Sequence, residues 1–124
     1  MELIQMIKAL GDESRINILN ILRYCPLCVC EIEEILCMTQ SNVSRHLNKL
    51  TNAKIVTYYK EAKYVYYKLN EETIENHPFI KELLESEFEK IDKLKDDYEK
   101  TISFKNNGLS CEVLEKCKGN TDDK

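Results

Sequence analysis

The stretch from Met38 to Leu50, MTQSNVSRHLNKL, has the pattern of an amphipathic helix with a polar outer face. Thr39 can cap its start, because the hydroxyl can accept a hydrogen bond from a backbone N–H of the first turn. Val43, Leu47 and Leu50 recur at spacings of four and three, which places them on one face. That face can pack against a preceding helix, so the stretch predicts the recognition helix of a DNA-binding helix-turn-helix. The alternative is an ordinary amphipathic helix with a solvated outer face.

The polar side chains of this stretch are of the types that contact nucleic acid. Amides pair with adenine, guanidinium groups with guanine, and hydroxyls with either base or with phosphate. They cluster toward the N-terminal end, which a recognition helix inserts into the major groove. The predicted DNA contacts in the helix are Gln40, Ser41, Ser44, Arg45 and Lys49, with Asn42 and His46 in secondary roles.

The net charge of −4 is unevenly distributed. Residues 1–38 carry −3, residues 39–69 carry +5, and residues 70–124 carry −6. Nucleic-acid affinity depends on a local basic surface rather than on the total charge. The middle third of the chain therefore supplies a candidate DNA footprint.

The flanking sequence predicts further helices and a hairpin. Apolar spacings predict a short first helix ended by Gly11, a second helix at the buried centre of the domain, and a third over about residues 28–37. After the recognition helix, two runs rich in Val, Tyr, Ile and Thr, residues 55–60 and 64–69, predict a β-hairpin. Its tip carries Lys60 and Lys63, which are placed to contact phosphate. A hairpin in this position is a "wing".

The C-terminal third predicts one long helix starting near Pro78. Its apolar positions recur at threes and fours over six turns: Ile80, Leu84, Phe88, Ile91, Leu94, Tyr98 and Ile102. A stripe of this length favours pairing with a second copy of the chain, although it could also pack on its own domain. We expect residues 1–105 to form one DNA-binding and dimerisation domain, and residues 106–124 to form a polar, cysteine-containing tail.

Six cysteines in this chain require an explanation. The N-terminus lacks the basic start and cleavage site of a signal peptide, and no apolar run could cross a bilayer, so we expect a cytoplasmic protein without membrane contact. In that reducing compartment, clustered cysteines indicate metal or metalloid binding or redox sensing. No glycine-rich phosphate loop and no nucleophile with a plausible base is present, which argues against an enzyme. A coiled-coil adaptor would leave the basic middle third unexplained.

Four stretches, taken in order, carry a family resemblance: ALGDESRINILNIL, LCVCEIEEIL, TQSNVSRHLNKLTNAKIV and YKEAKYVYYKL. With them the chain resembles the ArsR/SmtB family of metal-sensing repressors, most closely the arsenical resistance operon repressors. The resemblance implies a mainly α winged helix-turn-helix with a two-stranded β-hairpin. It also implies a homodimer, formed through the first and last helices, that leaves double-stranded operator DNA when the ion binds. Where the family usually has glycine at the hairpin tip, this chain has Ala62.

The family's Cys-Val-Cys sensor motif matches Cys28, Val29 and Cys30. In arsenic- and antimony-responsive members these thiolates bind As(III) or Sb(III). Trigonal As(III) or Sb(III) needs three sulfurs, and Cys25 could supply the third, since it lies three residues before Cys28 in a turn stiffened by Pro26. Cys111 and Cys117 are reserve ligands. Helical geometry turns residues two apart by about 200°, so we expect ion binding to distort the first turn of the third helix.

Other sites and ions remain as alternatives. A soft divalent inducer such as Cd(II), Pb(II) or Zn(II) is one, although cadmium- and lead-responsive members add cysteines from the N-terminal region and this chain has none before Cys25. A thiol redox sensor is another. Cys37 lies ~10 Å along the helix from Cys30, so it is expected to be a buried core residue rather than a ligand. His77 is expected to be a cap or surface residue.

Overall fold

A computed structural model describes residues 1–108 of the chain. Its α-helices are α1 (Glu2–Leu10), α2 (Glu13–Leu22), α3 (Val29–Leu36), α4 (Gln40–Asn52), α5 (Glu71–Asn76), α6 (Pro78–Glu82) and α7 (Asp92–Asn106). A π-helical turn, η1 (Leu83–Glu87), and a 3-10 turn, η2 (Phe88–Lys90), follow α6. Strands β1 (Val56–Glu61) and β2 (Tyr64–Leu69) form an antiparallel hairpin. The predicted fold class, mainly α with a two-stranded wing, is confirmed.

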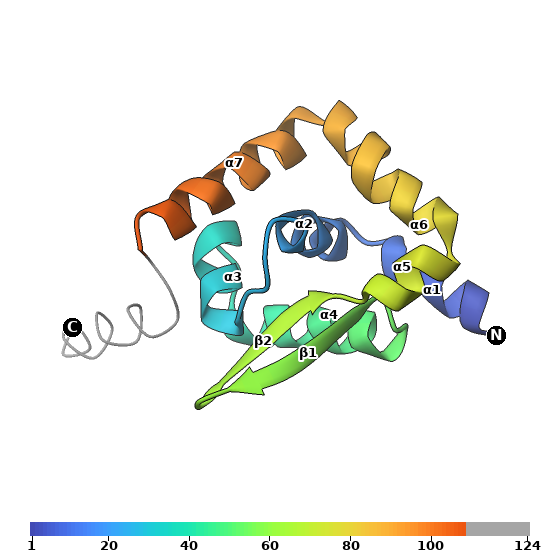
Figure 1. Cartoon of the computed structure of the whole chain (residues 1–124), viewed down its shortest axis with the longest axis horizontal. Coiled ribbons are helices and arrows are strands. Elements are labelled where there is room, and N and C mark those ends of the chain that lie inside the picture. The colour runs from blue at the N-terminus through green and yellow to red at the C-terminus, as the bar shows by residue number, and fades with distance from the viewer. Residues whose placement is uncertain (109–124) are drawn as a thin grey trace.

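Helix α2 lies at the centre of the molecule, as its apolar sequence predicted. It contacts α1, α3, α4, α7 and β2. Figure 1 shows α6 and α7 arching over one side of α2, with α4 and the hairpin on the other. The last five residues of α2 are all buried. Among the described residues, no helix is both long and apolar enough to cross a membrane.

Helices α3 and α4 form the predicted helix-turn-helix. The Thr39 hydroxyl accepts from the backbone N–H of Asn42 at 3.3 Å, which confirms it as the cap of α4. Val43, Leu47 and Leu50 have no exposed surface, and α3 packs on α4. The turn between the helices begins at Cys37, whose backbone is left-handed (φ 55°, ψ 47°). Cys37 is exposed, so its assignment to the core was wrong.

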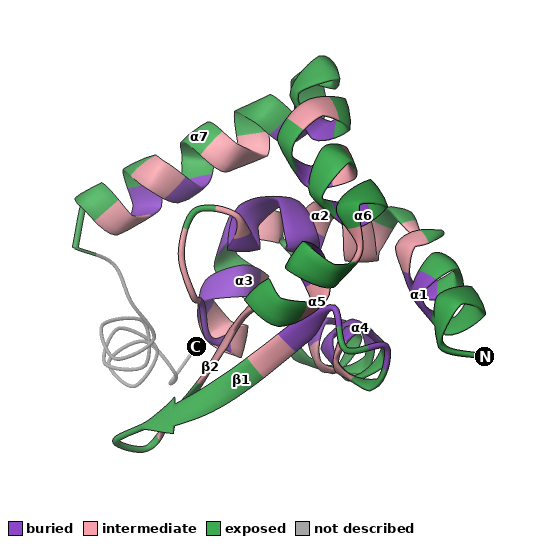
Figure 2. Cartoon of the chain, turned by 45° about the vertical axis from the view of Figure 1, so that its right-hand side comes forward, coloured by how far each residue is buried: buried purple, intermediate pink, exposed green. Residues whose placement is uncertain are grey.

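The wing is a tight hairpin whose outer half is exposed (Figure 2). Glu61 pairs with Tyr64, so the turn consists of two residues, Ala62 and Lys63. Ala62 has a positive φ of 56°, a conformation that glycine adopts at no steric cost and alanine does not. The base of β2 is also held from outside the hairpin: Leu27 N donates to Tyr67 O at 3.0 Å, and Tyr67 N donates to Leu27 O at 2.8 Å.

The expectation of one long C-terminal helix was wrong. The chain turns sharply at Ile91, whose backbone is extended (φ −110°, ψ 116°), and this separates the α6, η1 and η2 segment from α7. The bend lets both halves pack on their own domain, so Ile80, Leu84, Phe88 and Leu94 are buried without a second copy. The prediction of a dimer from the length of this apolar stripe therefore rested on an incorrect premise, because one domain covers these residues.

Two polar side chains at the C-terminal end of α2, Asn20 and the C-cap residue Arg23, hold the bend in place. Arg23 donates to the backbone oxygen of Leu84 at 3.1 Å and pairs with Glu89 at 2.9 Å. The buried Asn20 donates to the backbone oxygen of Leu94 at 2.7 Å, on the far side of the bend. Buried polar groups require such partners, so these bonds explain how a helix can end without proline or glycine.

Candidate DNA-binding face and cysteine site

The outer face of α4 presents most of the predicted DNA contacts to solvent. Arg45 donates to the Asn42 side-chain oxygen at 3.2 Å, so the two side chains lie together on the surface. Of the predicted residues, Gln40, Ser41, Asn42, Arg45 and Lys49 are exposed and Ser44 is half-buried. This arrangement can present amide, hydroxyl and guanidinium groups to base edges along one side of the helix.

His46 does not belong to that face, which corrects the assignment made from the sequence. Its side chain is only 7 % exposed and points toward α2. Its Nδ1 lies 3.2 Å from Arg15 Nη1 and 3.9 Å from Asp12 Oδ1. An arginine cannot give up its proton, so Nδ1 must be the acceptor and the imidazole is neutral. Burial lowers the pKa of His46 from its usual 6.5, in agreement with this assignment.

The wing presents its two predicted lysines at or beside its tip. Lys60 and Lys63 are both exposed, and the Lys63 ammonium lies 5.5 Å from the ring centroid of Tyr64. Tyr59 and Tyr66 stack across the strands with centroids 5.6 Å apart, which stiffens the hairpin. The tip can thus hold positive charge at a fixed distance from α4.

The two cysteines of the sensor motif come together without any distortion of α3. Cys28 is the N-cap of α3, with an extended backbone (φ −95°, ψ 170°), and the helix begins at Val29. As a result Cys28 Sγ lies 3.9 Å from Cys30 Sγ. The expected distortion of the first turn rested on the premise that both cysteines lie inside a regular helix, and that premise was wrong because Cys28 precedes the helix. A change of this turn on ion binding stays a prediction. Two thiolates on a tetrahedral ion with ~2.3 Å bonds lie ~3.8 Å apart, close to the separation seen here.

The structure does not bring a third cysteine to this pair within residues 1–108. In that part of the chain no three Cys, His, Asp or Glu side chains gather closely enough to hold an ion. Cys25 is half-buried, and burial raises the pKa of its thiol, which disfavours the thiolate. The reserve ligands Cys111 and Cys117 lie outside the described residues.

Glu31 is a functional candidate that the sequence reasoning missed. Its carboxylate is fully buried and pairs with Lys105 of α7. The same carboxylate accepts from the Cys28 backbone N–H at 2.9 Å and from Cys28 Sγ at 3.2 Å. The spacing Cys-x-x-Glu, with cysteine in place of serine or threonine, is that of a capping box and was the available signal. Glu31 therefore joins Cys28, at the start of α3, to α7.

A shared cavity connects the cysteine pair to the DNA-binding face. It has a volume of about 210 Å³ and lies between α3, the start of α4 and the wing. Its lining residues are Cys28, Val29, Cys30, Glu33, Gln40, Lys63, Tyr64 and Val65. The first residue of α4 and the tip of the wing thus border the same space as the two sulfurs.

Comparison with known proteins agrees with this arrangement. Residues 12–58 match the model of the family described as "Bacterial regulatory protein, arsR family". The chain is 36% identical over 89 residues to a cadmium resistance transcriptional regulatory protein CadC homolog from Staphylococcus aureus, covering 71% of this chain and 69% of the relative. It is 37% identical over 71 residues to an arsenical resistance operon repressor from Bacillus subtilis, covering 56% of this chain and 68% of the relative.

A solved structure extends the likeness to the fold. The transcriptional regulator HlyU from Vibrio vulnificus superposes with a TM-score of 0.55 at 34% identity, over 67% of this chain and 86% of that one. The family and its structural neighbours are DNA-binding transcriptional regulators rather than enzymes. The chain belongs to the ArsR family of bacterial transcriptional regulators.

Proposed function

We propose that this protein is a metalloid-responsive repressor that binds operator DNA as a homodimer and releases it when As(III) or Sb(III) binds Cys28 and Cys30. The observation that carries the proposal is the cavity shared by the two sulfurs, Gln40 and the tip of the wing. Soft thiolates select soft ions, and the 3.9 Å separation between the sulfurs suits two ligands of one ion. No resident cofactor is required for DNA binding.

The contacts around Cys28 supply a route from the ion to the DNA-binding face. Leu27, the residue before Cys28, exchanges two backbone hydrogen bonds with Tyr67 of the wing. Gln40 and Lys63 line the cavity itself. An ion that draws the two sulfurs together therefore acts on both DNA-contacting elements. Such a ligand shifts the equilibrium only through different affinities for the two states, and coupling of this kind is typically ~1–3 kcal/mol, or roughly 5- to 150-fold in affinity.

Operator affinity under full reduction tests the sensor, with arsenite as the titrant. Cys28→Ser and Cys30→Ser should bind DNA normally but remain bound when arsenite is added. Cys37→Ser is the matched control, because Cys37 is exposed and lies at the other end of α3, and it should be released as the parent is. Full arsenite-driven release of the Cys28/Cys30 double serine variant would refute the assignment. Working only with reduced protein excludes disulfide formation as the cause of release.

The third sulfur is assigned by the same assay and by X-ray absorption. Three sulfurs per arsenic are expected, with the third from Cys25 after a movement of its loop, or from Cys111 or Cys117. Serine variants of these three cysteines, made one at a time, identify the residue whose loss lowers the sulfur count to two. A count of two in the unaltered protein would contradict a trigonal site.

A second candidate function is response to a soft divalent ion at the same cysteines. The sulfur separation matches a tetrahedral thiolate site, and one relative is named for cadmium resistance. Titrating the operator complex with cadmium in place of arsenite separates the two. Release by cadmium at lower free concentration than arsenite would favour this second function.

The DNA-binding residues are tested by alanine variants. Arg45→Ala should cost ~1–3 kcal/mol of binding free energy and relax specificity at one base position, if Arg45 forms a bidentate contact with guanine. Lys60→Ala and Lys63→Ala should weaken binding to all duplexes about equally. Lys95→Ala is the control, because Lys95 is an exposed lysine of α7, on the opposite side of α2 from α4 (Figure 1). Unchanged operator affinity in a Gln40/Arg45 double alanine variant would overturn the assignment.

We propose that the homodimer forms through α1, since no single long C-terminal helix is present among residues 1–108. Leu3, Ile4 and Ile7 lie on one side of α1 and are 44 %, 44 % and 49 % exposed. Ile91, at the bend, is 49 % exposed as well. Exposed apolar side chains gathered on one helix mark an interaction surface, and we assign a second copy as its partner because helix-turn-helix dimers bind two half-sites of DNA. Ile4→Glu should yield monomers by ultracentrifugation, whereas an intact dimer would exclude this face.

A further inference from the structure

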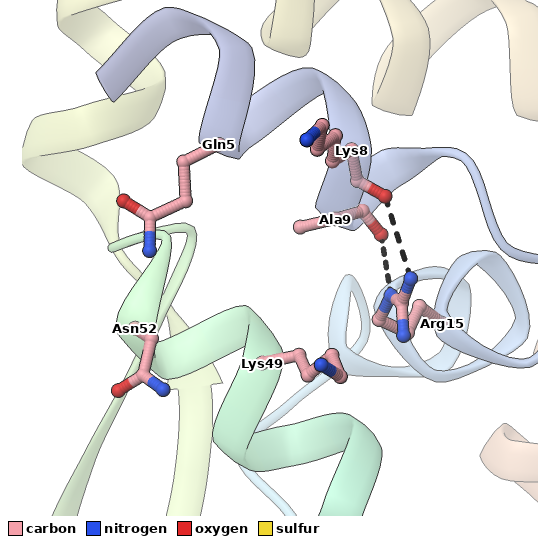
Figure 3. Close-up of a pocket in the computed structure, with 6 residues that line it drawn as sticks. All are labelled: Gln5, Lys8, Ala9, Arg15, Lys49 and Asn52. Atoms are coloured by element: carbon pink, nitrogen blue, oxygen red, sulfur yellow. Dashed lines mark hydrogen bonds between the residues drawn. The ribbon is translucent and has the colours of Figure 1, made fainter. Parts of the chain in front are cut away.

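A basic cavity lies beside the C-terminal half of α4, on the opposite end from the cysteine pair. Figure 3 shows it between α1, α2 and α4. It has a volume of about 270 Å³ and is lined by Gln5, Lys8, Ala9, Arg15, Lys49 and Asn52. Three of these six side chains are cationic and two are amides, so the lining consists almost wholly of groups that donate hydrogen bonds to anions.

The fold fixes one of the three charges in place. Arg15 Nε donates to the backbone oxygen of Ala9 at 2.7 Å, and Nη2 donates to that of Lys8 at 3.3 Å (Figure 3). Its third contact is Nη1 to His46 Nδ1 at 3.2 Å. These bonds tie α1, α2 and α4 together around the guanidinium. The nearby Asp12 carboxylate is directed to the start of α2, where it accepts from the Arg15 backbone N–H at 3.1 Å. The lining itself contains no carboxylate.

The cavity opens along the side of α4 that carries the predicted base contacts. Ser41, Arg45, Lys49 and Asn52 follow one another at spacings of four, four and three, which forms a single stripe down the helix. When the N-terminal part of such a stripe enters the major groove, the sugar–phosphate backbone bordering the groove passes its C-terminal part. We propose that this cavity receives a phosphate group of the duplex backbone, with Lys8 and Gln5 adding contacts from α1 to those of Lys49 and Asn52.

This inference rests on the proposed function, because it requires that α4 binds DNA. It adds a contact from outside the helix-turn-helix and the wing. It also places a DNA contact on α1, the helix whose exposed residues Ile4 and Ile7 are proposed to pair with a second copy. Arg15 is a positioning residue here, since its guanidinium is already engaged by three protein groups.

Lys8→Ala is the variant of choice, because Lys8 is exposed and its removal leaves the core intact. We expect affinity for the operator and for an unrelated duplex to fall by the same factor, roughly twofold to fivefold, as for loss of an exposed ion pair. The slope of log affinity against log salt should fall by about 1. The matched control is Lys95→Ala, which removes an exposed lysine of α7. It should change neither the affinity nor the salt dependence. Lys8→Ala binding identical to that of Lys95→Ala would overturn the inference.

A duplex carrying one neutral methylphosphonate identifies the phosphate. Scanning the substitution along the operator should reveal a position that weakens the parent protein but leaves Lys8→Ala unaffected. If no position does so, the cavity does not receive backbone phosphate. If instead inorganic phosphate perturbs the amide signals of Gln5 and Asn52 and duplex DNA does not, the cavity binds a free anion and the inference is wrong. Failure of the parent protein to bind any duplex would refute the proposed function itself.

Discussion

Replacing Lys105 by methionine should destabilise the protein far more than replacing its partner Glu31 by glutamine. The Glu31 side chain is 0 % exposed, whereas that of Lys105 is 26 % exposed. Without Lys105 the carboxylate is left buried without its cation, and removal of one partner of a buried pair costs ~3–5 kcal/mol. The loss of unfolding free energy should therefore be about 3–5 kcal/mol.

Glu31→Gln leaves a different situation, because the remaining charge can reach water. The amide oxygen still accepts from the Cys28 backbone N–H, and the partly exposed Lys105 ammonium can turn outward. We expect a loss of about 1 kcal/mol, the net value of one hydrogen bond. The Glu31→Gln/Lys105→Met double variant should resemble Glu31→Gln alone, because the uncompensated charge is gone.

Urea unfolding at pH 7 and one fixed protein concentration measures these differences. Lys95→Met is the matched control on the exposed side of α7 and should change the unfolding free energy by less than about 0.5 kcal/mol. If Lys105→Met costs no more than Lys95→Met, the buried pair does not hold α7 to α3. If Glu31→Gln costs as much as Lys105→Met, the asymmetry argued from burial is wrong.

Three further predictions test the wing, the buried histidine and the bend. Ala62→Gly should stabilise the protein by about 0.5–1 kcal/mol, because the relief of a strained positive φ outweighs the added conformational entropy of the unfolded chain. If urea unfolding shows no increase in unfolding free energy, the turn geometry is contradicted. The pKa of His46 is lowered in the folded state, so its contribution to stability is full above about pH 6.5 and is lost as the pH falls below that value. His46→Gln should reduce this loss of unfolding free energy at acid pH, and an unchanged pH dependence would contradict the role of the histidine. Phe88→Asp should unfold the chain, whereas Ile91→Asp should leave it folded by circular dichroism, because Phe88 is 2 % and Ile91 49 % exposed.

Local patterns predicted the elements that position the DNA-binding face. Thr39 and the spacing of Val43, Leu47 and Leu50 were enough to locate α4, since cap chemistry and helical period act within a few residues. The same spacing places His46 on the buried face, three residues after Val43 and four before Leu50. The prediction that His46 contacts DNA followed from the chemistry of imidazole and did not take this position into account.

The features that escaped prediction depend on contacts between distant segments. The bend at Ile91 has no proline or glycine in the sequence, and it is held by Asn20 of α2 and by Arg23, the C-cap of that helix. The ion pair of Glu31 and Lys105 joins residues 74 positions apart. Neither helical period nor turn chemistry carries information about such partners, because tertiary packing overrides local preference.

The start of α3 connects the two cysteine sulfurs to the wing and to α7. Within five consecutive residues, Leu27 bonds to the wing, Cys28 and Cys30 approach to 3.9 Å, and Glu31 pairs with α7. In the proposed sensor, an ion held by Cys28 and Cys30 would lie beside the Glu31 carboxylate, because Cys28 Sγ lies 3.2 Å from that group. Under the proposed function, a small displacement of this N-cap would reach the wing through the Leu27 bonds to Tyr67 and would reach α7 through the Glu31 pair with Lys105.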